Sequence, residues 1–217
     1  MGFTSLISKE IKKLKHNLLY MGGKVEHNFT RAVNSIENRD VELANKVINN
    51  DIEIDTMEVD IEEESLKILA LHQPVAKDLR FIVTTLKVNN DLERIDDFCV
   101  HLAKHALFFA DKPLFKMPFE FNKMASLVRT MLKESLDSLV ELDQAKAIKV
   151  REKDDAVDDI NKQMYKTALE IMRSNPDMIE LQMHAVGISN SFERIADLST
   201  NIAEDVIYLV SGQIVRH

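Results

Sequence analysis

Apolar positions recur every three or four residues over long stretches of the chain, a spacing typical of amphipathic helices. The spacing predicts six helices, at about residues 5–38, 40–73, 75–110, 120–143, 145–174 and 177–211. Gln73-Pro74 and Asn175-Pro176 separate the last two helices of each half, because the residue before a proline disfavours helical backbone. We therefore expect an all-α protein built from six long antiparallel helices.

The two halves of the chain repeat one another. Residues 90–103 align with residues 190–203 without a gap, at a shift of 100 residues that places Glu193 on Glu93. The second helix of each half repeats more loosely, at a shift of 103 residues that places Asp154 on Asp51. This repetition predicts two tandem three-helix bundles related by a pseudo-twofold axis.

A short stretch with two prolines, residues 111–118, lies between the halves and is typical of a linker. The predicted repeats are thus residues 1–110 and 119–217. The whole chain of 217 residues has only 5 glycines and 4 prolines, too few for the many tight turns of a β-sandwich or barrel.

Each repeat carries one Glu-x-x-x-Asp motif on its third helix. Residues four apart lie on the same face of a helix, and the second helix of each repeat offers a matching pair of aspartates. If these helices are antiparallel neighbours, four carboxylates converge in each repeat. The expected groups are Asp51, Asp55, Glu93 and Asp97 in the first repeat, and Asp154, Asp158, Glu193 and Asp197 in the second.

Converging carboxylates repel one another, by about 3 kcal/mol for two charges roughly 6 Å apart at an effective dielectric constant near 20. A bound cation, raised pKa values, the neighbouring Arg94 and Arg194, or wide separation in water would each offset this repulsion. Ligands that are all oxygen suit hard ions such as Mg, Mn or Ca, and also Fe. The duplication favours metal sites over an ordinary solvated acidic face.

Three weaker features accompany these motifs. His101 and His105 are four residues apart below Asp97; they could extend a metal site, but a solvated surface is the simpler interpretation. Asp96 enlarges the first acidic group, whereas its counterpart is Ala196, so any role of Asp96 is confined to one repeat. Glu58 and Glu62 are expected to face solvent.

Composition excludes several classes of protein. A formal net charge of −8 gives no basis for a groove that binds nucleic acid. Cys99 is the single cysteine, so an intrachain disulfide is impossible, and the chain fits the reducing cytoplasm. No apolar run approaches the roughly 18 residues needed to cross a membrane, so an integral membrane segment is not expected.

The sequence lacks the motifs of common enzymes, such as a glycine-rich phosphate loop, Gly-x-Ser-x-Gly or His-Glu-x-x-His. The main alternative is a carboxylate-bridged metalloenzyme on a helical bundle, such as a ferritin-like di-iron oxidase. That site needs Glu-x-x-His twice, and no glutamate here has a histidine three residues later. A purely structural helical scaffold is a third interpretation. We expect a protein that is not an enzyme.

Further motifs run along nearly the whole chain: Glu10-Ile-Lys-Lys-Leu-Lys, Met21-Gly22, Gln73-Pro-Val-Ala-Lys-Asp-Leu-Arg80, Leu92-Glu-Arg-Ile-Asp-Asp97, Phe192-Glu-Arg-Ile-Ala-Asp197, Asn201-Ile-Ala-Glu204, Gly212 and Val215-Arg-His217. Together they resemble the motifs of one known family, the PhoU family of phosphate-transport regulators. The family usually has glycine where this chain has Asp96 and Ala196. The acidic positions of the motif are retained.

The resemblance implies two three-helix repeats with multinuclear metal clusters at the Glu-x-x-x-Asp motifs, and a homodimer. It also implies a negative regulator of phosphate transport and phosphate homeostasis in the cytoplasm. Such a regulator is expected to connect a sensor histidine kinase with the ATPase subunit of the phosphate ABC transporter.

Overall fold

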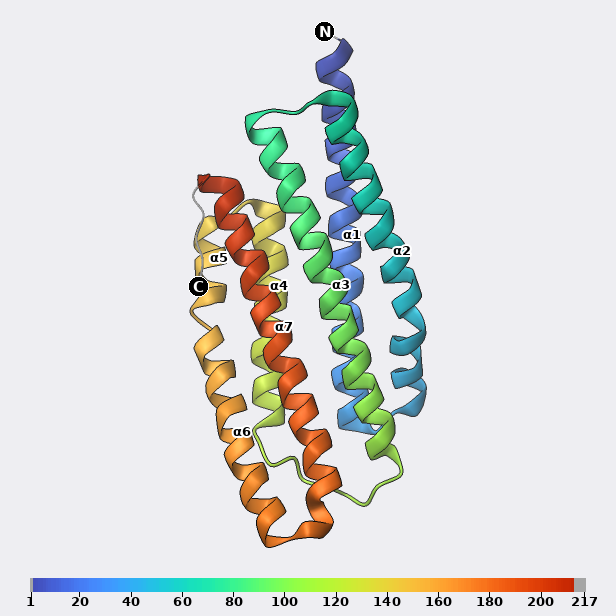
Figure 1. The fold of residues 1–217 in the computed structure, drawn as a ribbon, viewed down its shortest axis with the longest axis vertical. Helices are drawn as coiled ribbons and strands as arrows, with labels where there is room; N and C mark the ends of the chain where they lie inside the picture. The colour runs from blue at the N-terminus through green and yellow to red at the C-terminus, as the bar shows by residue number, and fades with distance from the viewer. Residues whose placement is uncertain (1, 213–217) are drawn as a thin grey trace.

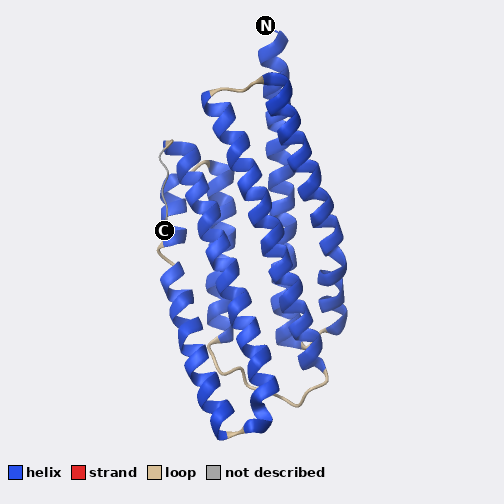
Figure 2. Cartoon of the chain, viewed as in Figure 1, coloured by secondary structure: helices blue, strands red, loops and turns tan. Residues whose placement is uncertain are grey.

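The computed structural model describes residues 2–212, with side chains from residue 6 onward. Met1 and residues 213–217 lie outside the described residues, and so do Val215-Arg-His217 of the family resemblance and the ends of both predicted repeats. Figures 1 and 2 show helices joined by loops, without a strand in the described part of the chain. The elements are α1 (Gly2–Asn38), α2 (Val41–His72), α3 (Ala76–Ala110), α4 (Phe121–Glu141), α5 (Gln144–Arg151), α6 (Asp154–Ser174), the 3₁₀ turn η1 (Pro176–Met178) and α7 (Ile179–Ser211).

The all-α fold with six rods is confirmed, with one correction to the predicted helices. The fifth rod, predicted as one helix over residues 145–174, consists of α5 and α6 with a turn at Glu152 and Lys153. The turn places Asp154 and Asp155 in the first turn of α6. Carboxylates are stabilised there by the partial positive charge of the helix N-terminus, so the acidic pair favours a new helix start.

The two repeats lie side by side, and their third helices form the centre of the molecule (Figure 1). α3 and α7 run antiparallel and pack against each other along much of their length. α2 packs against α3 on one side, and α5 and α6 pack against α7 on the other. α1 and α4 lie behind the central pair in this view, each packed against the third helix of its own repeat.

Contacts between α3 and α7 reveal the pseudo-twofold axis. Lys87 on α3 forms an ion pair with Asp205 on α7, with Nζ and Oδ1 2.6 Å apart. At the positions shifted by 100 residues, His105 lies against Gly187, so closely that a Cβ added to Gly187 would be 2.5 Å from the His105 Nε2. The two contacts are therefore exchanged by the same rotation that exchanges the repeats.

The first helices also repeat, as two three-helix bundles require, and the structure supplies the alignment that the sequence analysis did not make. Leu18, Met21, Val25 and Phe29 of α1 are buried, and so are the α4 positions 103 residues later, which are Phe121, Met124, Val128 and Leu132. The turns that follow match as well, because Arg39 and Leu142 both adopt left-handed backbone, with φ of 53° and 55°. All six rods therefore follow one duplicated plan.

The main hydrophobic core spans both repeats. Phe192 of α7 packs edge-on against Phe29 of α1, with ring centroids 6.1 Å apart, and against Phe121 of α4 at 5.5 Å. Gly22 brings α1 and α4 together, because an added Cβ would lie 2.9 Å from Leu136 Cδ2. No helix among residues 2–212 combines the length and apolar character needed to cross a membrane.

Candidate metal sites

The acidic residues of the second repeat meet between α6 and α7. Asp154, Asp158 and Asp197 each place one carboxylate oxygen so that the three atoms lie within 4.8 Å of one another. Glu193 adjoins them, and burial, followed by the charge of Asp197, raises the pKa of this glutamate. All four predicted acids of this repeat therefore share one small region.

Basic groups lie against this second cluster. Lys162 Nζ is 3.2 Å from an oxygen of Asp158, and Arg194 Nη1 is 3.2 Å from an oxygen of Asp197. Both cations are exposed, so each ion pair contributes little to stability and can be displaced. The hollow beside the cluster, of about 390 Å³, is lined by Asp158, Asn161, Lys162, Tyr165, Asn190, Glu193 and Arg194.

The acids of the first repeat face one another between α2 and α3. Burial raises the pKa of Asp51, and the charges of Asp55 and Asp97 raise it further. The pKa of Glu93 is raised by burial and then by Asp97 and Asp55. The four carboxylates thus share a common space, although in the described residues only the second-repeat acids bring three ligand oxygens within 4.8 Å.

Glu58 belongs to the first cluster, contrary to the prediction that it faces solvent. It is half-buried, and burial raises its pKa, with contributions from Glu62 and Asp55. Its place three residues after Asp55 on the same helix face is the signal that could have found it. Glu62 is exposed, as predicted.

Asp96 is fully buried and turns toward α1. Its Oδ1 accepts a hydrogen bond of 2.9 Å from Asn28 Nδ2, and burial raises its pKa to about 7. Its Oδ2 has no hydrogen-bond partner in the described part of the chain. Ala196 occupies the matching buried position, so this polar feature is confined to the first repeat.

The two predicted histidines separate. His101 is exposed and contacts Phe98 edge-on, with ring centroids 5.7 Å apart. His105 faces α7, where its Nδ1 lies 2.9 Å from Nδ1 of His184, and burial lowers the pKa of His105 to about 4. The interpretation of His105 as a solvated surface residue is therefore wrong, because the close approach of Gly187 draws this ring into the contact between the repeats.

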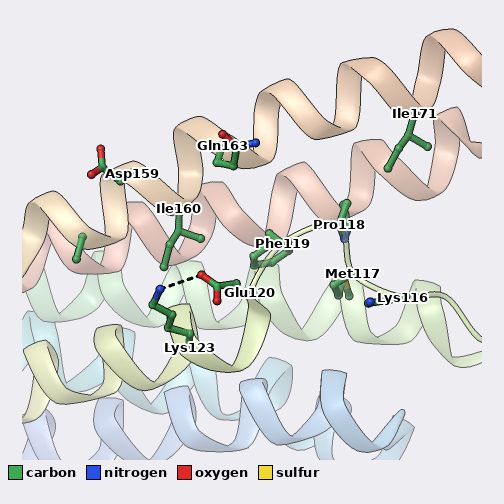
Figure 3. A pocket seen from close by; sticks show the side chains of 11 residues that line it. Lys116, Met117, Pro118, Phe119, Glu120, Lys123, Asp159, Ile160, Gln163 and Ile171 are labelled. Carbon is green, nitrogen blue, oxygen red and sulfur yellow. Dashed lines mark hydrogen bonds and ion pairs between the residues drawn. The ribbon is translucent and has the colours of Figure 1, made fainter.

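A larger hollow of about 910 Å³ lies along the linker (Figure 3). Met117, Phe119 and Ile160 give it a mainly apolar wall, and Lys123 pairs with Glu120 at its edge. The linker side chains Phe115, Met117 and Phe119 also pack on a small second core between α6 and α7. The linker therefore covers helix surface as well as joining the repeats.

The donor atoms of both clusters fit a hard cation. All predicted ligands are carboxylate oxygens, which suit ions such as magnesium, manganese and calcium. The raised pKa values at Asp51, Glu93 and Glu193 reflect burial and mutual repulsion, both of which a nearby positive ion would oppose.

A duplicated all-α bundle with an acidic cluster between the second and third rods of each repeat defines the class of this protein. The family model described as "PhoU domain" matches the chain twice, at residues 18–106 and 121–206. The chain belongs to the PhoU family.

Named relatives agree along nearly the full length. A protein of Clostridium acetobutylicum named phosphate-specific transport system accessory protein PhoU homolog is 33% identical over 209 residues, covering 96% of this chain and 95% of the relative. A Pseudomonas aeruginosa protein of the same name is 36% identical over 213 residues, covering 96% and 86%. The relatives are named as accessory proteins of phosphate transport and not as enzymes, which confirms that part of the prediction.

Two solved structures share the fold. The crystal structure of PhoU from Pseudomonas aeruginosa has a TM-score of 0.91 at 35% identity and covers 95% of this chain and 99% of its own. The crystal structure of the phosphate transport system regulatory protein PhoU from Streptococcus pneumoniae has a TM-score of 0.85 at 28% identity, covering 97% and 100%.

Proposed function

We propose that this chain is a metal-binding negative regulator of phosphate transport and of the phosphate-starvation response. The observation that carries the proposal is the meeting of matched carboxylates at equivalent places in two repeats of a PhoU-family bundle. The protein acts in the cytoplasm, as a homodimer, by connecting a sensor histidine kinase with the ATPase subunit of the phosphate ABC transporter. The relatives' names as transport accessory and regulatory proteins support this role.

The bound ions would join the second rod of each repeat to the third. Mg, Mn, Fe or Ca at the first cluster would draw α2 toward α3, and at the second cluster would draw α6 toward α7. Removing the ions leaves the carboxylates to repel one another, which loosens the same helix pairs. Metal content would thereby set how rigid a surface the regulator presents to its partners.

Metal analysis of the purified protein tests the first part. The variant Glu93→Ala, Asp97→Ala, Glu193→Ala, Asp197→Ala should lose bound metal. A control that removes four exposed acids, Asp60→Ala, Glu63→Ala, Glu170→Ala, Asp177→Ala, should retain it. Equal metal content in the wild type and the first variant would refute the metal sites.

Deletion of the gene tests the regulatory part. Loss of a negative regulator should derepress phosphate uptake in phosphate-rich medium, and the wild-type gene should restore repression. The four-site variant should restore it less well than the control variant. Normal phosphate control in the deletion strain would refute the regulatory role whatever the metal content.

A further inference from the structure

A small basic cavity lies between α1 and α2, and none of the eight predicted acidic ligands lines it. Its volume is about 140 Å³, and its lining residues are Lys24, His27, Asn28, Arg31, Asn50, Glu53 and Ile54. Lys24, His27 and Arg31 are three and four residues apart, so they form one stripe along α1. Two permanent cations and a histidine thus meet in one hollow of a chain whose net charge is −8.

The cations of the cavity are only partly neutralised. Lys24 forms an ion pair of 2.8 Å with Glu53, whose side chain is about half exposed. Arg31 is half-buried, and its guanidinium has no hydrogen bond or ion pair with any described residue. A guanidinium offers five N–H donors in a planar fork, which matches the oxygens of phosphate. The strongest oxyanion-binding group of the cavity is therefore available.

The floor of the cavity supplies further polar contacts. Asn50 Nδ2 lies 3.4 Å from Asn28 Oδ1 and donates to it, and Asn28 in turn donates to Asp96. An amide nitrogen carries two hydrogens, so Asn50 keeps one for a ligand. The hydrogen bond to Asp96 holds the buried Asn28 in place, and Asn28 in turn orients Asn50 toward the cavity.

The size of the cavity decides the class of ligand. A cavity of about 140 Å³ holds a small ion such as phosphate. Nucleotides and other drug-sized ligands require several hundred Å³. We propose that this cavity binds a free tetrahedral oxyanion, with inorganic phosphate as the ligand, held by Arg31, Lys24, His27 and Asn50.

The equivalent positions of the second repeat lack the oxyanion-binding side chains of the cavity. At the shift of 103 residues, Arg31 corresponds to Glu134 and Asn50 corresponds to Lys153. Glu134 and Lys153 form an ion pair with each other, so the acid neutralises the base that stands at the Asn50 position. An oxyanion site is therefore expected in the first repeat alone, with one phosphate bound per chain.

Titration calorimetry with inorganic phosphate on the full chain tests the proposal. The protein is first stripped of metal with a chelator, so that phosphate cannot bind through an ion at the acidic clusters. One phosphate should bind per chain, and Arg31→Gln should weaken binding at least tenfold because it removes a charge-assisted contact. Glu53→Gln should tighten binding several-fold, because it frees Lys24 and removes a repelling carboxylate.

Lys12→Gln is the matched control, since it removes the same charge from an exposed position of α1. It should leave the affinity within twofold of the wild type, and circular dichroism should show equal helix content in all variants. Equal losses for Lys12→Gln and Arg31→Gln would overturn the site in favour of general charge attraction. No saturable binding at millimolar phosphate would overturn it as well.

Repeating the phosphate titration on metal-loaded protein separates this proposal from the proposed metal sites. Phosphate that binds only to metal-loaded protein would belong to the acidic clusters, and the cavity would be refuted while the proposed metal function stood. Phenyl phosphate should compete poorly, because its ring occupies one of the phosphate oxygens and adds volume to a ligand for a cavity of about 140 Å³. Equal competition would refute selectivity for the free ion.

Discussion

The two repeats share one arrangement of apolar residues but differ in their polar ones. The first repeat has a continuous α2, a buried Asp96 held by Asn28, and an open basic cavity. The second has a rod divided into α5 and α6, Ala196 in place of the buried acid, and an internal ion pair in place of the cavity. Burial positions define the fold, so the polar residues between them have been free to change.

This difference teaches that duplicated motifs need not mean equivalent sites. Both repeats keep the four acids, yet the second brings three carboxylates closest together and pairs two of them with Lys162 and Arg194. The first adds Glu58 and Asp96 to the acidic environment. We expect the two sites to differ in affinity, and the following changes probe the comparison from the largest effect to the smallest.

Core truncation tests whether the repeats fold as one unit. Phe192→Ala should lower the free energy of unfolding by about 3–5 kcal/mol, and Leu92→Ala at the matching position by about 2–5 kcal/mol. Phe192 contacts aromatic rings of both repeats, so each variant should still show a single denaturation transition. Two denaturation transitions, with the midpoint of only one of them lowered by the substitution, would show that the repeats unfold independently.

The histidine contact tests the interface between the repeats. His105 has a pKa of about 4 in the folded chain, below the ordinary 6.5, so it stays neutral while the unfolded chain takes up a proton. As pH falls from about 6.5 to 4, stability should fall by at most about 1.4 kcal/mol per pH unit from this group.

The measurement is urea denaturation in the presence of chelator across this pH range. His105→Gln should flatten the acid limb of the profile, because glutamine does not titrate. His16→Gln, at an exposed position, should leave the profile unchanged. An equal slope in the wild type and His105→Gln would contradict the assignment.

The second rod of each repeat begins with an aspartate N-cap, and the two caps are expected to differ in how much they stabilise the protein. Asp40 accepts one hydrogen bond from the backbone of α2, at Leu43 N, whereas Asp143 accepts two from α5, at Ala145 N and Lys146 N. Asp40→Ala should cost about 1 kcal/mol and Asp143→Ala up to about 2 kcal/mol. Thermal unfolding measures both, and a larger loss for Asp40→Ala would contradict the ranking.

The smallest expected effect concerns the matched arginines. Arg194 pairs with Asp197 and competes with a cation there, so Arg194→Gln should tighten Mn²⁺ binding at the second cluster by about two- to threefold. The measurement uses a background with Glu93→Gln and Asp97→Asn, which leaves one cluster intact. Arg94→Gln, in a background with Glu193→Gln and Asp197→Asn, should leave the Mn²⁺ affinity of the first cluster unchanged within error. A lower Mn²⁺ affinity of the second cluster in Arg194→Gln would contradict the competition.

Periodicity alone predicted most of the fold. It missed the turn at Glu152 and Lys153 because apolar spacing continues across it, from Val150 to Val157 to Ile160. It predicted three helices in each repeat but did not align α1 with α4, because residues such as Phe29 and Leu132 share burial but not identity. Apolar matching preserves volume and not side-chain type, so an alignment of identical residues does not detect it.

The positions of the eight acids were predictable, and their role as metal ligands stays a prediction. Spacing on one helix and repetition across the chain were enough to expect that they meet. Glu58 and the basic cavity depend on how α2 is rotated against its neighbours, which follows from packing in three dimensions. Single-helix spacing has no information about that rotation.

The pseudo-twofold axis between α3 and α7 has a consequence for recognition. A homodimer of one repeat would present two identical surfaces to a binding partner, and every mutation would appear on both. Here both repeats belong to one chain, so a mutation changes one repeat only. A difference such as Asp96 in the first repeat and Ala196 at the equivalent position of the second makes the two halves distinguishable. A partner that spans the axis can then distinguish its two ends and dock in a single orientation.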